Sequence, residues 1–173
     1  VGAGVVGAVL VAAQALPAAA AGPLSDEDNF RARFVIGVEL AARDLYQAAI
    51  DAGAQGTAWG ILVTQHASYA ERIAGITGIS ADRRDEGVYG DREANFTGSS
   101  PANAAFALEN ELAATHANLL TLITDVRIAD ALASIAAAEA HHAAYLAERS
   151  GRGDNFDAMF INSAAPIVTA VAS

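Results

Sequence analysis

The chain has 173 residues, which is enough for one domain with its own apolar core. Its net charge of −10, with no cluster of basic residues, excludes a nucleic-acid-binding protein, because such proteins neutralise phosphates with Lys and Arg. No Cys is present, so disulfides, thiolate metal sites and Cys nucleophiles are excluded as well.

Residues 1–22 form an apolar first segment in which Gln14 is the only polar residue. One interpretation is the apolar part of an export signal, and the other is an anchor of roughly the length that spans a bilayer. We favour a retained segment that packs against lipid, a partner or a second copy. The small residues Gly4, Ala8 and Ala12 have the spacing that permits close approach of two helices.

Four helices are predicted within residues 25–150, and 53% hydrophobic residues dominated by Ala favour close helix packing. Ser25 is a good N-cap, and the acids that follow it suit a helix N-terminus. Ser100 and Pro101 mark a second helix start of this kind. The helices are expected at about residues 25–52, 57–76 and 101–123, and from the turn at Asp125 to Arg149.

The connections between these helices predict the topology. The break at residues 53–56 is short, so the second helix should return antiparallel to the first. Residues 80–100 are polar and too many for a tight turn, as in a crossover connection. We therefore predict an all-α protein, an antiparallel four-helix bundle with a long crossover between helices two and three. Residues 151–173 form an apolar tail that should pack on the bundle or on a partner.

The middle of the chain repeats itself. The sequence Glu-Leu-Ala-Ala at Glu39 returns at Glu111, in each case five residues after a Phe. Residues 65–70 align with residues 138–143 at nearly the same offset. The repeat indicates two related helical hairpins, which together make a bundle with a carboxylate–histidine centre.

Acid and His residues lie at matching levels of the four predicted helices. Glu139 and His142 are three residues apart and therefore face the same way. A buried carboxylate or imidazole needs a partner, a proton or a metal ion, and several in one layer point to a metal. The candidate ligands of Fe, Mn or Zn are Glu39, His66, Glu111, Glu139 and His142.

Four other residues near this layer receive different interpretations. Tyr69 is a weak ligand or a hydrogen-bond donor, and Tyr46 lies on the face of Glu39 as a redox-active neighbour or as a core residue. His116 is about 140° around the helix from Glu111, so we expect it to leave the site, and His141 to point away likewise.

This order of residues resembles the ferritin-like superfamily and looks closest to extracytoplasmic ferritin-like domain proteins of bacteria. The resemblance covers about residues 26–149. It implies that one Glu from each of two helices and a Glu-x-x-His pair from each of the others bind two irons. Glu39, Glu111, Glu139 and His142 match this pattern, whereas His66 stands in the place of a Glu and Tyr69 in the place of a His.

Two functions remain open from the sequence. We expect mainly a structural or accessory protein, exported to the periplasm or cell envelope, with a degenerate metal centre. Residues 1–21 and the tail would hold it to a membrane, to a membrane-protein assembly or to a second copy in a homo-oligomer. The alternative is a metal-binding oxidoreductase or iron-handling protein that uses Fe, Mn or Zn.

Overall fold

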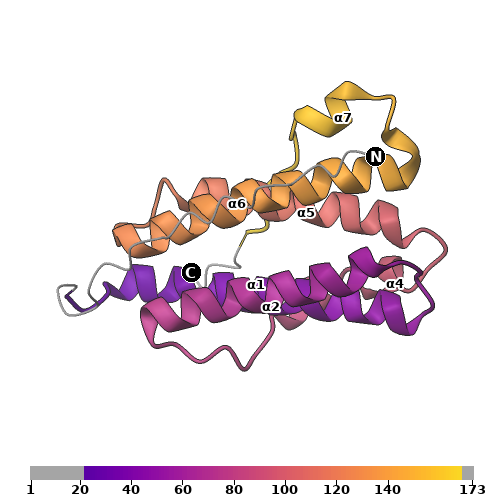
Figure 1. Ribbon diagram of the computed structural model, residues 1–173. Helices are drawn as coiled ribbons and strands as arrows, with labels where there is room; N and C mark the ends of the chain where they lie inside the picture. Colours follow the sequence, from indigo (N-terminus) through magenta and orange to yellow (C-terminus); the bar gives the residue numbers. More distant parts are fainter. Residues whose placement is uncertain (1–21, 169–173) are drawn as a thin grey trace, which may run out of the picture.

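The computed structural model describes residues 22–168, and all regular structure within them is helical (Figure 1). Four helices are long: α1 (Asp26–Asp51), α2 (Thr57–Thr77), α5 (Pro101–Leu119) and α6 (Val126–Ala147). The prediction of an all-α protein is confirmed. The predictions for residues 1–21, and for the last five residues of the tail, lie outside the described residues.

The long helices form two antiparallel hairpins that face each other (Figure 1). In the first hairpin, α1 reverses into α2 through a turn in which Gly53 and Gly56 have φ angles of 100° and 111°. L-residues with a Cβ rarely adopt such angles, so glycine is required at both positions. In the second hairpin, residues 120–125 connect α5 to α6.

The helix ends agree with the predicted caps and differ in two bounds. The Ser25 side chain accepts a hydrogen bond from the backbone N–H of Asp28, and Asp125 caps α6 in the same way. Helix α5 ends at Leu119, before the predicted Ile123. Helix α6 ends at Ala147 and continues only as a π-helical turn, Glu148–Arg152, which includes Gly151 at a φ of 78°.

The long connection between the hairpins packs closely against α1. It contains two short helices, α3 (Glu86–Gly90) and α4 (Glu93–Phe96), and buries Val88 and Phe96. The backbone N–H of Asp85 donates to the carbonyl of Gly37 at 2.8 Å. A Cβ at Gly37 would lie 3.4 Å from that nitrogen, so the small residue permits the close approach.

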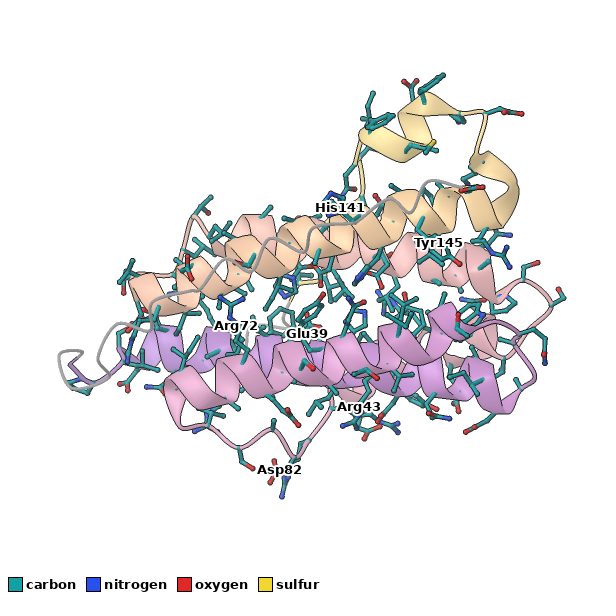
Figure 2. All side chains as sticks on the ribbon, in the orientation of Figure 1. Glu39, Arg43, Arg72, Asp82, His141 and Tyr145 are labelled. Carbon is teal, nitrogen blue, oxygen red and sulfur yellow. The ribbon has the colours of Figure 1, made fainter. Side chains whose placement is uncertain are left out.

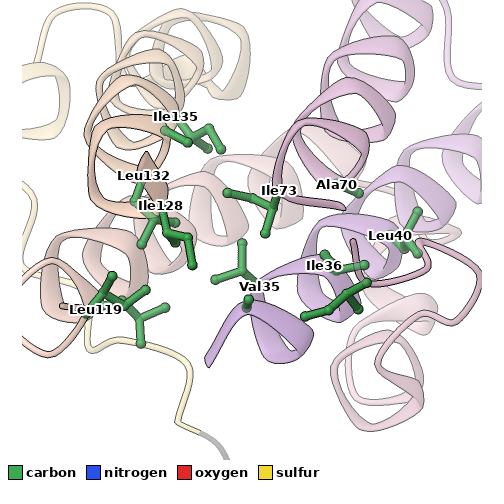
Figure 3. Packing of buried hydrophobic residues seen from close by; sticks show 13 residues of the cluster. Val35, Ile36, Leu40, Ala70, Ile73, Leu119, Ile128, Leu132 and Ile135 are labelled. Carbon is green, nitrogen blue, oxygen red and sulfur yellow. The ribbon is translucent and has the colours of Figure 1, made fainter. Parts of the chain in front are cut away.

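Buried apolar side chains form two clusters, one toward each end of the long helices. The first contains Ile36, Ile73 and Ile128 from three different helices (Figure 3). The second contains Leu45 and Leu108. Between the two clusters lies a layer of buried charged and polar residues, which is therefore shielded from water along the helix axes.

The tail lies along the second hairpin. After α7 (Phe156–Phe160) the chain runs extended, and the N–H of Ile167 donates to the Thr115 hydroxyl at 2.8 Å. Phe156 and Phe160 stay exposed and stack on each other. Within residues 22–168 we find no helix that is both long enough and apolar enough to cross a bilayer.

Candidate metal centre

Five charged or titratable side chains with no exposed surface meet between the two apolar clusters. They come from all four long helices: Glu39, His66, Glu109, His116 and Glu139. Figure 2 shows Glu39 pointing from α1 into the space between the hairpins. Removing so many polar groups from water is costly unless each gains a hydrogen bond, a counter-charge or a metal ion.

His66 lies between two carboxylates. Its Nδ1 donates to Oε2 of Glu39 at 2.7 Å, and its Nε2 donates to Oε1 of Glu109 at 3.0 Å. Glu109 accepts two more hydrogen bonds, from the Tyr46 hydroxyl at 2.5 Å and from Nδ1 of His142 at 3.1 Å. Both oxygens of Glu109 thus have hydrogen-bond partners.

His116 makes the corresponding link on the other side. Its Nδ1 forms a hydrogen bond with Oε2 of Glu139 at 2.7 Å, while its Nε2 lies 3.2 Å from Oε1 of Glu39 without forming a hydrogen bond. Three buried atoms are left without a hydrogen-bond partner among the described residues: Glu39 Oε1, Glu139 Oε1 and His116 Nε2. Buried polar atoms without a partner are rare and indicate a missing ion, water or proton.

The surroundings of Glu109 and Glu139 shift the pKa values of these two carboxyl groups in opposite directions. Burial opposes the ionisation of Glu109, but the charge of His66 and the hydrogen bonds from His142 and His66 outweigh it and lower the pKa of Glu109 to about 2. Burial, together with the charges of Glu39 and Glu109, raises the pKa of Glu139 well above its ordinary value. Without a bound cation, Glu109 is therefore ionised and Glu139 holds a proton.

The two fully buried histidines also differ. Burial lowers the pKa of His66, but the charge and hydrogen bond of Glu109, together with those of Glu39, outweigh it and raise this pKa well above 6.5. Burial lowers the pKa of His116, which favours the neutral ring. A neutral imidazole with one N–H donated to a carboxylate has a lone pair on its other nitrogen, as a metal ligand requires.

Stability of the metal-free protein should fall as the pH rises above about 6.5. His66 and Glu139 both have raised pKa values in the folded state, so each folded group retains a proton that the unfolded chain releases. A bound cation favours the deprotonated carboxylate, so metal should oppose this loss. Thermal unfolding of chelator-treated and metal-supplemented protein between pH 6.5 and about 9 measures both effects. A melting temperature of the chelated protein that rises over this interval would contradict the assignment.

The predicted site residues divide into two groups. Glu39, His66, Glu139 and His142 lie together in the centre, and Tyr46 contacts it through Glu109. Tyr69 is half-buried, packs edge-on against His66 and stacks on His142 with ring centroids 6.4 Å apart. Because the His142 side chain is 12% exposed, these two residues form the edge of the centre that lies closest to solvent.

The structure does not bring Glu111 to the buried centre, but it does bring His116 there, which was expected to leave the site. Glu111 is 30% exposed and binds Arg92 at 2.8 Å, whereas Glu109 provides the buried carboxylate of α5. Two residues along a helix are about 200° around its axis, so Glu109 and Glu111 face opposite ways. His116 is two turns from Glu109 and faces the centre with it. His141 is exposed on the outer side of α6, as predicted (Figure 2).

The donor set fits a transition-metal ion. Two groups of side chains have ligand atoms that all lie within 4.8 Å of one another: His66 with Glu109 and His142, and Glu39 with His66 and Glu139. Carboxylate oxygens and imidazole nitrogens are ligands of Fe, Mn and Zn. The unpartnered oxygens of Glu39 and Glu139 are the buried atoms that a cation would satisfy. The centre could therefore hold a metal ion.

Comparison with known proteins does not assign the chain to a family. No model of a known protein family matches it, and neither a curated protein nor a solved structure is significantly similar to it. The metal centre is therefore inferred from the geometry of its own side chains. The resemblance to ferritin-like proteins is inferred from the pattern of helices and potential ligands in this chain.

Proposed function

We propose that this protein binds a divalent transition-metal ion, Fe, Mn or Zn, in the buried centre between its two helical hairpins. The observation that carries the proposal is the set of unpartnered atoms, Glu39 Oε1, Glu139 Oε1 and His116 Nε2, which have no exposure to water. Each of these atoms belongs to a potential metal ligand, and a bound cation would account for their lack of hydrogen-bond partners.

We also propose that the protein is ferritin-like, with an altered ligand set. In that architecture each of two helices contributes a Glu and each of the other two contributes Glu-x-x-His. Here Glu39 and Glu109 supply the single carboxylates, α6 supplies Glu139 and His142, and α2 supplies His66 in place of a Glu. His116 brings the imidazoles in the cluster to three, so three carboxyl groups and three imidazoles are gathered there.

The bound ion would supply either redox chemistry, as Fe or Mn, or Lewis acidity, as Zn. The protein side chains would hold and shield it. The apolar clusters on both sides exclude water, and Tyr46 fixes the orientation of Glu109. The half-buried pair Tyr69 and His142 leaves one edge of the centre near the surface, which favours access by a small molecule. These features favour an oxidoreductase or iron-handling role over a role without a metal ion.

The structural or accessory role expected from the apolar ends stays a prediction. It depends mainly on residues 1–21, which lie outside the described residues. The expectations of export, of membrane association and of a homo-oligomer depend on the same residues. The exposed Phe156 and Phe160 on α7 are compatible with a partner contact but do not identify one.

Elemental analysis of protein purified without chelator tests the proposal. We expect close to stoichiometric Fe, Mn or Zn in the wild type and its loss in Glu139→Gln, which keeps the size of the side chain but removes its charge. The matched control is Glu111→Gln on the outer face of α5, which should keep its metal. A wild type free of metal, or equal metal in both variants, would reject the proposal.

A further inference from the structure

The two sides of the buried centre differ in how completely their hydrogen bonds are made. On the side formed by Tyr46, His66, Glu109 and His142, both oxygens of Glu109 and both nitrogens of His66 have partners. The three unpartnered buried atoms of the described residues all lie on the other side, which Glu39, His116 and Glu139 form.

Each unpartnered atom belongs to a side chain whose other polar atom makes a hydrogen bond and so holds the side chain in place. Glu39 is fixed through Oε2 by His66, and Glu139 is fixed through Oε2 by Nδ1 of His116. In each group one atom anchors the side chain and the other atom remains free for a ligand. This arrangement, in which a His donates its second N–H to a carboxylate, is typical of a histidine that binds a metal ion.

The contact between His116 and Glu39 indicates a cation most directly. Nδ1 of His116 is engaged in its hydrogen bond with Glu139, so Nε2 is the ring nitrogen that remains available to a metal ion. This Nε2 lies 3.2 Å from Oε1 of Glu39, and neither atom has a hydrogen-bond partner or exposure to water. A cation beside both atoms would supply the contact that each of them lacks.

We propose that a single divalent transition-metal ion binds on this side, with Glu39, His116 and Glu139 as its protein ligands, and that the His66 side takes no ion. The proposal rests on the proposed function, because it assumes that the centre binds metal at all. It limits the protein ligands to three of the buried side chains and predicts one ion per chain instead of two. A second ion at Glu109 would have to displace the hydrogen bonds from Tyr46, His66 and His142.

Equilibrium dialysis of the chelator-treated full chain against Mn²⁺ tests this assignment, with His116→Gln and His141→Gln compared under the same conditions. We expect one Mn²⁺ per wild-type chain. Affinity should fall by about 100-fold or more in His116→Gln, since even residues that only support a ligand cost 10–100-fold. In His141→Gln it should stay within about three-fold, because this neighbouring histidine is exposed on the outer side of α6.

Pulsed EPR of the wild type with bound Mn²⁺ tests the same assignment if His116→Gln does not fold. The account predicts hyperfine coupling to one imidazole nitrogen. Coupling to two imidazoles, two Mn²⁺ per chain, or equal losses in the two His variants would overturn the single-ion site and leave the proposed function standing. A wild type that binds neither Mn²⁺ nor Fe²⁺ nor Zn²⁺ would overturn both.

Discussion

Replacing Glu109 by Leu should be among the most destabilising single changes in this protein, by about 3–5 kcal/mol in the free energy of unfolding. Glu109 accepts hydrogen bonds from Tyr46, His66 and His142, and all its atoms are buried. Leu leaves the phenol without a partner and leaves the imidazole of His66 with one carboxylate in place of two. Urea unfolding of the chelator-treated protein, followed by circular dichroism, measures the effect.

The matched control for this change is Glu111→Leu, two residues further along the same helix. Glu111 forms one partly exposed ion pair with Arg92, and pairs of this kind contribute about 0–1 kcal/mol. Both substitutions remove one negative charge and add one Leu to α5, so they differ only in the face of the helix. Similar losses of stability in the two variants would show that the Glu109 network does not stabilise the fold.

Restoring a Glu-x-x-His pair on α2 should create a second metal site. The double substitution His66→Glu and Tyr69→His gives α2 the pattern that Glu139 and His142 have on α6. It removes the imidazole that fills the space between Glu39 and Glu109 and supplies a fourth carboxylate there. We expect metal bound at saturation to rise from one ion to two per chain, measured by equilibrium dialysis against Mn²⁺.

The metal-free form of this double variant should also unfold at a lower temperature than the metal-free wild type, because like charges would lie together without His66 between them. Tyr69→His alone is the control and should stay at one ion per chain, since it leaves the hydrogen bonds of His66 to Glu39 and Glu109 intact. A double variant that still binds one ion would show that His66 is not what excludes the second.

The helical arrangement could be predicted from the sequence because its signals are local. Ser25 and Asp125 cap their helices through contacts within three residues, and Gly53 and Gly56 make a turn that few other residues can make. The packing of the long connection could not be predicted, since its contact with Gly37 joins residues that are far apart in the chain.

The acidic residue of α5 that lies in the centre is two residues away from the predicted one. The repeated Glu-Leu-Ala-Ala aligns Glu39 with Glu111, but the side chains that meet in space align Glu39 with Glu109. A signal for the correct register exists. Tyr46 follows Glu39 by seven residues, and His116 follows Glu109 by seven, so each pair faces the core two turns apart. Periodicity of the buried positions is a better guide here than a matching four-residue sequence.

Anomalous X-ray diffraction from crystals of the natively purified protein, at the absorption edge of the metal found by elemental analysis, tests the central claim most directly. The account predicts one strong peak per chain, beside Oε1 of Glu39, Oε1 of Glu139 and Nε2 of His116. No peak in the layer between the hairpins, with the centre held by hydrogen bonds alone, would contradict it.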